Sequence, residues 1–300
     1  MSDSDALSFS VVVPTHNRPQ RLHECLRALS RQEYPSASFE VVIVDDGGDV
    51  DLEPVVRGYR ESMQLSLLTE RNRGPAAARN RGAAAARGRY LAFTDDDCRP
   101  APDWLSVLAE HAMEAPHDLL GGSVENGLQD NPFAAASQLL TSYLFQYYDE
   151  DGAETRFLTS NNMVVEASRF RTLGGFADMG VRAAAEDREL CARWRANGYR
   201  LRYVRNAVVH HFQDLTLPGF WRQHFTYGRG AHHFHVRRTG RTLAGVRPEP
   251  PSFYAGLLRY PFRRGLGPEA WSQVLLLALS QIANAAGFLW ERSRLPMLSE

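Results

Sequence analysis

Short apolar runs alternate with amphipathic segments over the first hundred residues. The runs FSVVVPT (9–15), FEVVIVDD (39–46), LSLLTE (65–70) and RYLAFTD (89–95) predict strands. Because these runs are continuous rather than alternating, we expect strands that are covered on both faces. Helical patterns separate them, and this β-α order favours a parallel sheet with right-handed crossovers.

Two of the intervening helices are indicated by spacing and by their ends. Apolar residues from Leu22 to Leu29 recur at helical spacing and form one face. A second helix is expected to begin near Pro75, since proline suits the first helical position, and to end before Gly88.

The regular alternation stops after residue 100. Two further helices are expected at 102–113 and 183–200, a short strand within 157–170 and a late strand at 201–212. This pattern of elements therefore predicts an α/β domain over residues 1–213. A helical region over residues 214–300, in contact with an acceptor or with a membrane, follows it.

Polar and acidic residues follow three of the predicted strands. They are the segments 14–18, 45–47 and 95–97. An aspartate after a strand is often only a helix N-cap or an Asx turn. Ligands of parallel α/β sheets bind beyond the carboxyl ends of the strands, so three such segments favour a binding site at one sheet edge.

Three consecutive aspartates, Asp95, Asp96 and Asp97, repel one another at neutral pH. Carboxylates two residues apart can converge on one hard divalent cation. Magnesium and manganese usually complete their ligand sets with water and substrate phosphates. The D-x-D pattern therefore predicts a metal ion that holds a diphosphate, although a single D-x-D is common by chance.

Charge and cysteine content exclude several classes of protein. The formal net charge of −1 gives no electrostatic case for nucleic-acid binding. Three distant cysteines argue against a disulfide framework or a cysteine-based zinc site and favour a reducing compartment. The segment MSDSDALS lacks the features of a signal peptide, so a cytoplasmic location is expected.

One long apolar segment, WSQVLLLALSQIANAAGFLW (271–290), has three interpretations. It is a buried core helix, a helix that lies on a membrane surface, or a spanning helix, the last being less convincing because Gln273, Gln281 and Asn284 interrupt it. The preceding cluster RYPFRR would suit anionic headgroups. Peripheral contact through residues 259–290 would place the protein at the inner face of the cell membrane.

An ordered set of motifs resembles the family 2 glycosyltransferases. The set is VVVPTHNRPQRL, VVIVDDGGD, NRGPAAARNRG, FTDDDCRP, SNNMVV, LGGF and EDRELCARWRANGYR, over roughly residues 8–212. The resemblance implies the GT-A fold, a Rossmann-like, mostly parallel nucleotide-binding sheet flanked by helices. It also implies an inverting, metal-dependent enzyme that transfers one sugar from a nucleoside-diphosphate sugar to an acceptor hydroxyl. The expected donor is a UDP-sugar, and the expected role is in cell-envelope or polysaccharide glycan synthesis.

The same resemblance implies which residues contact the nucleotide. They are Pro14, Thr15, Asn17, Arg18, Asp45, Asp46, Asn72, Gly74, Arg79 and Asn80. The D-x-D falls on Asp95 and Asp97, candidate ligands of Mg²⁺ or Mn²⁺. Asp97 is expected to bind the metal directly, and Asp95 or Asp96 to contact ribose.

A histidine after the late strand binds the metal or the diphosphate in several relatives. Here the pattern favours His211, and the choice between His210 and His211 stays open at this point. Successive strand residues point to opposite faces, so one of the two is expected to face inward.

The pair Glu186-Asp187 resembles the ED motif of the family and implies that Asp187 is the catalytic base. An inverting transfer needs a carboxylate to take the acceptor proton, while the metal stabilises the leaving diphosphate. The alternative is an acidic first turn of a helix. Glu186 and the residues Asn161, Asn162, Gly174 and Gly175 are expected near the donor sugar or the acceptor, although the glycines are also consistent with a simple turn.

Other functions are consistent with parts of the sequence. A sugar-phosphate nucleotidylyltransferase would need a glycine-rich loop where PTHNRPQ stands, and a non-catalytic nucleotide-sugar binding protein would not need Asp187. The stretch FWRQHFTYGRGAHHF (220–234) departs from the Gln-x-x-Arg-Trp motif of polymerising relatives, which disfavours processive synthesis. The expected partners are a nucleotide sugar and a glycan or lipid-linked acceptor; the oligomeric state is left open.

Overall fold

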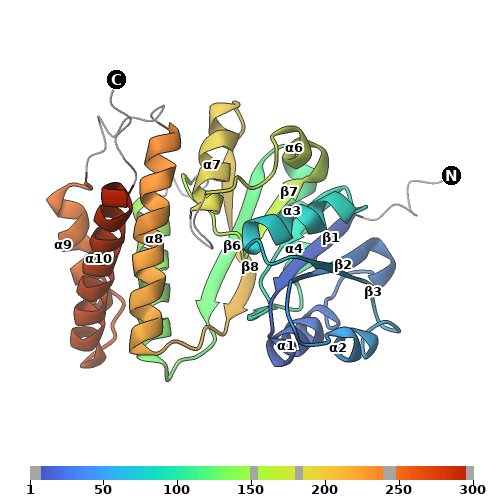
Figure 1. Ribbon diagram of the computed structural model, residues 1–300, viewed down its shortest axis with the longest axis horizontal. Helices are drawn as coiled ribbons and strands as arrows, with labels where there is room; N and C mark the ends of the chain where they lie inside the picture. The colour runs from blue at the N-terminus through green and yellow to red at the C-terminus, as the bar shows by residue number, and fades with distance from the viewer. Residues whose placement is uncertain (1–7, 149–154, 180–184, 239–247, 295–300) are drawn as a thin grey trace. The chain divides into compact units, whose positions relative to one another are not determined.

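The protein consists of two compact units (Figure 1). The computed structural model describes residues 8–148, 155–179, 185–238 and 248–294. The first unit comprises Met1–Gly127, Asp149–Ala177 and Asp187–Phe212, and the second Leu128–Tyr148, Asp178–Glu186 and Gln213–Glu300. The division into two domains at residues 1–213 and 214–300 stays a prediction. Residues 1–7, where a signal peptide is not expected, lie outside the described residues.

The first unit contains an eight-stranded sheet of order β3-β2-β1-β4-β7-β6-β8-β5 among the described residues. Its strands are β1 Phe9–Thr15, β2 Phe39–Asp46, β3 Gln64–Glu70, β4 Tyr90–Phe93, β5 Cys98–Pro100, β6 Leu119–Asn126, β7 Met163–Glu166 and β8 Leu201–His211. Four of the seven described pairings are parallel: β1 with β2, β1 with β4, β2 with β3, and β6 with β8. The predicted α/β class and mostly parallel sheet are therefore confirmed.

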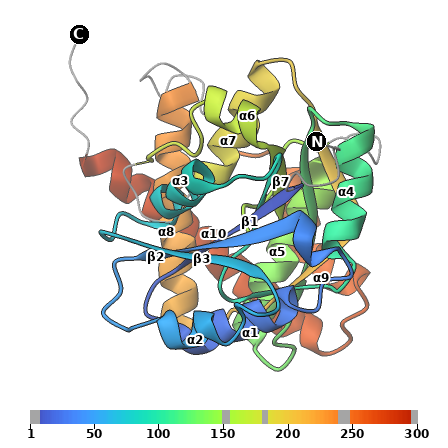
Figure 2. The ribbon, with the colours of Figure 1, turned by 90° about the vertical axis from the view of Figure 1, so that its right-hand side faces the viewer.

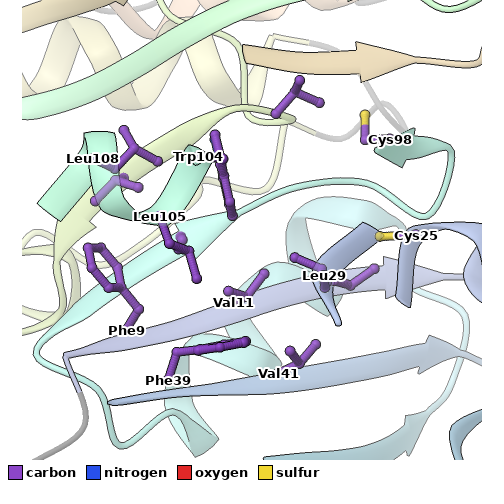
Figure 3. Packing of buried hydrophobic residues seen from close by; sticks show 14 of the residues in the cluster. Phe9, Val11, Cys25, Leu29, Phe39, Val41, Cys98, Trp104, Leu105 and Leu108 are labelled. Atoms are coloured by element: carbon purple, nitrogen blue, oxygen red, sulfur yellow. The ribbon is translucent and has the colours of Figure 1, made fainter. Parts of the chain in front are cut away.

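Helices cover both faces of the β1–β3 region, as the continuous apolar strands predict (Figure 2). The helices of this unit are α1 Pro19–Leu29, α2 Glu53–Arg57, α3 Pro75–Ala85, α4 Trp104–Glu114, α6 Ala167–Thr172 and α7 Glu186–Ala196 (α7 begins one residue before the unit boundary). On one face, Val11 and Val41 of the strands join Leu29 of α1 and Leu105 of α4 in one buried cluster (Figure 3). On the opposite face, Val42 and Val44 pack against Ala78 of α3.

Two strands of this sheet, β5 and β6, have no counterpart among the predicted elements. Strand β6 contains Gly121 and Gly122, which weaken a strand pattern. A Cβ at Gly122 would lie 2.0 Å from the backbone oxygen of Ala207, so glycine allows β8 to approach at its register shift. The three residues of β5 pair Cys98 with His211 of β8.

The second unit is helical, as predicted for the C-terminal region. Its helices are α5 Pro132–Tyr148, α8 Leu217–Arg238, α9 Pro251–Arg263 and α10 Glu269–Arg294. Helices α8 and α10 run side by side (Figure 1). They approach closely at Gly228 and Gly287, where an added Cβ would lie 1.9 Å from the backbone oxygens of Asn284 and Phe225, respectively.

Helix α10 carries the long apolar segment. Among the described residues, α10 is the helix that is long and apolar enough to cross a membrane, judged by length and composition. In its most apolar stretch of 18 residues, 28% is buried. Buried positions such as Leu277 and Ala283 alternate with exposed ones such as Leu275 and Ile282. The helix therefore has one packed face and one exposed apolar face.

Candidate active site

A hydrogen bond joins the carboxyl end of β1 to the segment that follows β4. Thr15, the last residue of β1, donates its hydroxyl to Asp96 Oδ2 at 2.7 Å, and both residues are buried. The neighbouring Pro14 is in register with Val44 of β2, which places Thr15 opposite Asp45. The parallel pairings thus bring three of the predicted polar segments to one edge of the sheet.

Two arginines from the start of α1 contact the aspartates. Arg18 Nη1 lies 3.2 Å from Asp96 Oδ1, and Arg21 Nη1 lies 2.9 Å from Asp97 Oδ2. Arg18 was expected at this edge and Arg21 was not. A cation in the first turn of a helix opposes the helix dipole, so an arginine there indicates a nearby anion, a signal that could have identified Arg21.

The surroundings of Asp96 make it an unusual carboxyl group. Burial and the charge of the adjacent Asp97 raise the pKa of Asp96 to about 6, although Arg18 and the Thr15 hydroxyl act in the opposite direction. The surroundings therefore disfavour the ionised form of Asp96, which is the carboxyl group of the triplet with a raised pKa.

Asp97 and His211, two candidate metal ligands, lie beside each other. His211 Nε2 lies 3.3 Å from Asp97 Oδ1, and the exposed fraction of the His211 side chain is 19%. Burial opposes ionisation of both groups, but their mutual hydrogen bond and attraction lower the pKa of Asp97 and raise that of His211. His210 points elsewhere: its side chain is 43% exposed and lies 3.6 Å from Glu125.

The side chains of Asp97, Cys98 and His211 bring one oxygen, one nitrogen and one sulfur atom close together. The ligand atoms of Asp97, Cys98 and His211 all lie within 4.8 Å of one another. Burial raises the pKa of the Cys98 thiol well above its usual range, which keeps it protonated and unsuited to a hard cation. The carboxylate and imidazole that remain fit Mn²⁺ or Mg²⁺ once water and phosphate oxygens supply the other ligands.

Asp95 is held by a different partner. Arg79, a buried side chain of α3, lies 2.6 Å from Asp95 Oδ1 through its Nη2 atom. Asp95 does not belong to the group that Asp97 and His211 form among the described residues. The structure therefore places Arg79 beside Asp95, and each of the three aspartates has different surroundings.

The residues after β2 shape the neighbouring backbone. Both carboxylate oxygens of Asp46 accept backbone N–H groups, from Arg73 at 2.7 Å and Gly74 at 2.9 Å. Gly74 has a φ of 92°, a conformation that favours glycine, and α3 begins at the next residue. Asp46 thus fixes the entry into α3. Asp45 makes a smaller loop by accepting the N–H of Gly48 at 3.0 Å.

Asn17 and Asn72 lie in the loops at the same strand ends. Asn17 has a φ of 55°, and its Oδ1 accepts the N–H groups of Asp49 at 2.8 Å and Val50 at 3.2 Å. The Asn72 amide is 3.4 Å from the ring nitrogens of His16. Asn17 therefore connects the loops after β1 and β2.

The two asparagines before β7 differ in their surroundings. The Asn162 amide donates to the carbonyls of Ser123 at 2.8 Å and Ala207 at 2.9 Å, and it accepts from the Trp104 indole at 2.9 Å. Asn161 Oδ1 is buried and has no hydrogen-bond partner in the described part of the chain. Asn162 braces β6 and β8, whereas Asn161 offers an acceptor that a ligand could use.

Gly174 and Gly175 form the turn after α6. Both have positive φ, 86° and 66°, and the N–H of Gly175 donates to the Phe170 carbonyl at 2.9 Å. A Cβ at Gly175 would lie 2.4 Å from Asn80 Oδ1. Asn80 also exchanges hydrogen bonds of 2.7 and 2.8 Å with the backbone of Phe176. Asn80 therefore anchors this turn to α3, and Gly175 leaves the space that the Asn80 side chain needs.

The expected catalytic pair begins helix α7. Glu186 is buried and Asp187 is partly buried. The preceding Ala185 has a φ of 68°, a strained conformation for a residue with a Cβ. Backbone strain of this kind clusters at functional sites, and an acidic first turn is also favoured by the helix dipole.

Comparison with known sequences gives a family. Residues 10–174, more than half of the chain, match the profile described as Glycosyl transferase family 2. The glycosyltransferase AglE of Haloferax volcanii is 25% identical over 267 residues, covering 83% of this chain and 84% of that protein. Validoxylamine A glucosyltransferase of Streptomyces hygroscopicus is 35% identical over 138 residues, covering 45% of this chain and 30% of that protein.

Comparison with solved structures confirms the expected GT-A fold. The mannosyltransferase PcManGT from Pyrobaculum calidifontis, solved with GDP-Man and Mn²⁺, has a TM-score of 0.69 at 18% identity, covering 96% of this chain and 88% of that one. TarS of Staphylococcus aureus, solved with UDP-GlcNAc, has a TM-score of 0.57 at 20% identity, covering 96% and 91%.

Proposed function

The chain belongs to glycosyl transferase family 2 and is a glycosyltransferase, and from this premise we propose an inverting, metal-dependent enzyme. It would transfer one sugar from a UDP-sugar to an acceptor hydroxyl in cell-envelope or polysaccharide glycan synthesis. The pairing of Asp97 with His211 at the sheet edge carries the proposal.

The nucleotide would bind over the ends of β1, β2 and β4. Thr15 and Asp96 are hydrogen-bonded there, and Asp45 and Asp46 hold the adjoining loops. Arg18 and Arg21 already lie beside two carboxylates, so they are placed to contact the diphosphate. Structural relatives were solved with GDP-Man and with UDP-GlcNAc, so GDP-sugars are the alternative donors.

Asp97 and His211 would hold Mg²⁺ or Mn²⁺ together with the diphosphate, and Asp95 is a further candidate ligand. A bound divalent ion stabilises the negative charge that develops on a leaving diphosphate. Arg21 fixes one oxygen of Asp97 while His211 lies beside the other, so the carboxylate is oriented before any ligand arrives.

Asp187 would accept the proton of the acceptor hydroxyl as its oxygen attacks the anomeric carbon of the donor sugar. Asp187 is the second residue of α7, two residues after the strained Ala185, and its Oδ1 accepts the N–H of Arg188 at 2.7 Å. Glu186 and Asn161 would help position the sugar or the acceptor. Gly174 and Gly175 would do so through the backbone of their turn.

The test of this function is the variant Asp187→Asn, which retains size and removes the base. We expect transfer to fall at least 100-fold while donor affinity changes less than twofold. Glu189→Gln, on the same helix and paired with Arg193 at 2.7 Å, is the matched control and should retain most activity. An equal loss of donor affinity in Asp187→Asn would remove its assignment as the base.

Peripheral membrane contact through residues 259–290 is a separate part of the proposal. Trp271, Leu275, Ile282 and Leu289 are 59–72% exposed and recur along α10 at intervals of four or seven residues. Arg263 and Arg264 precede this face, which suits an anionic bilayer and a lipid-linked acceptor.

The membrane contact is tested with full-length protein and vesicles that contain anionic lipid. The double variant Leu275→Gln/Ile282→Gln should no longer float with the vesicles, whereas Met113→Gln, at a 72% exposed residue of α4, should float like the unchanged protein. If the unchanged protein never floats, this part of the proposal fails.

A further inference from the structure

A pocket of about 400 Å³ lies within the second unit, outside every group assigned to the transfer reaction. It is open to solvent between α5 and α9, two helices that pack against each other. Its lining is Tyr143, Gln146, Tyr147, Ser252, Ala255, Gly256, Arg259, Tyr260 and Arg263. Its volume lies within the usual range for small-molecule sites.

The charged lining of this pocket is entirely cationic. Arg259 and Arg263 are one helical turn apart on α9, and both are exposed. Neither forms a hydrogen bond or an ion pair within the described part of the chain, unlike Arg229, which is bound to Glu291 at 2.6 Å. The carboxylate of Glu249 is not part of the lining, and it accepts the Tyr148 hydroxyl at 2.6 Å.

Three tyrosine rings form one part of the lining. Tyr143 is buried, and its hydroxyl donates to the Phe253 carbonyl at 2.7 Å. Its ring meets those of Tyr147 and Tyr260 at centroid distances of 5.9 and 5.5 Å. A Cβ at Gly256 would lie 2.4 Å from the Tyr143 hydroxyl oxygen, so glycine is required for this packing.

We propose that this pocket binds a phosphate group attached to a small polar or ring-shaped moiety. Two neighbouring guanidinium groups match the charge and hydrogen-bonding geometry of phosphate oxygens. Gln146 and Ser252 supply further polar atoms in the lining, and the exposed ring of Tyr147 supplies an apolar surface for the attached moiety. The phosphate would belong either to a lipid headgroup or to a soluble phosphorylated compound.

The site is tested by binding, without a donor or transferase assay, so its outcome is independent of the proposed transfer reaction. The vesicle measurement shares Arg263 with the proposed membrane contact, and the uncharged change Ala255→Leu separates the two. The full-length protein is mixed with phosphatidylcholine vesicles, with vesicles that also contain phosphatidylglycerol, and with glycerol 3-phosphate measured by calorimetry. Two variants change the site in different ways. Arg259→Gln/Arg263→Gln removes its charge, and Ala255→Leu narrows it without changing charge.

The matched control is Arg31→Gln/Arg57→Gln, which removes two exposed arginines of the first unit. We expect both pocket variants to weaken binding at least tenfold and the control to change it less than twofold. Loss of vesicle binding alone assigns a lipid phosphate, and loss of glycerol 3-phosphate binding assigns a soluble one.

Three results would overturn the proposal. The first is that neither phosphate-bearing probe binds. The second is that Ala255→Leu binds as tightly as the unchanged chain, which would indicate diffuse charge attraction. The third is that the control weakens binding as much as the pocket variants do. Circular dichroism verifies that each variant is folded.

Discussion

His211 Nε2 lies 3.3 Å from Asp97 Oδ1 because the three-residue strand β5 pairs with the end of β8. We predict that His211→Ala weakens Mn²⁺ binding in the presence of UDP by about tenfold or more. His210→Ala should change it little, because that side chain lies beside Glu125 instead. Calorimetric titration of Mn²⁺ measures both, and equal affinities for the two variants would refute the role of His211.

Much of the first unit could be predicted from the sequence. The expected strands 9–15 and 39–46 coincide with β1 and β2. These strands contain long runs of β-branched residues, and every residue in them is buried. A strand that is covered on both faces is apolar along its whole length, so the sequence alone reveals it. The expected helix starting at Pro75 is also confirmed, and its proline follows the positive-φ Gly74.

The elements that complete the site were harder to predict. Strand β5 has three residues, too few for any periodicity. Strand β6 contains two glycines: Gly122 allows the close approach of β8, and Gly121 packs against the Leu158 side chain. The position of Asn162 in a buried bracing network also depends on partners far away in the sequence, Trp104 and Ala207. No local pattern distinguishes it from Asn161.

Arg79 is buried and bonded to Asp95 at 2.6 Å. Arg79→Met should lower the free energy of unfolding by about 2–3 kcal/mol, because it leaves a partly buried carboxylate without its cation. Arg81→Met, at an exposed position on the same helix, should cost less than about 0.5 kcal/mol. Urea unfolding measures both, and similar costs would show that the ion pair contributes nothing.

Close packing of α8 and α10 at Gly228 and Gly287 leaves no space for a Cβ. Gly228→Ala and Gly287→Ala should each destabilise the protein by about 3 kcal/mol or force the helices apart. Gly58→Ala has its nearest neighbour atom at 3.5 Å and should be close to neutral. Thermal unfolding compares the three, and an unchanged melting temperature in Gly287→Ala would contradict this packing.

His224 on α8 is buried, with its Nε2 atom 3.3 Å from the Ser137 hydroxyl. Burial lowers the pKa of His224 from 6.5 to about 4. Between pH 4 and 6.5, His224 is therefore protonated in the unfolded chain and neutral in the folded chain. Stability from this group is present above pH 6.5 and decreases as the pH falls toward 4.

The expected loss between pH 6.5 and 4 is about 3 kcal/mol. His224→Gln should remove this part of the pH dependence, even if the variant is less stable at pH 7. Denaturant unfolding at several pH values measures it, and identical pH slopes for the variant and the unchanged chain would contradict the assignment.

If this sheet edge is the active site, the protein consumes a nucleotide sugar there. The direct measurement is release of nucleoside diphosphate from a panel of UDP- and GDP-sugars with Mn²⁺ and candidate acceptors, compared with Asp97→Asn. We predict that at least one donor is consumed, and that the variant loses at least 100-fold of this activity. Absence of binding and turnover for every donor would contradict the account, as would release of pyrophosphate from a nucleoside triphosphate and a sugar phosphate.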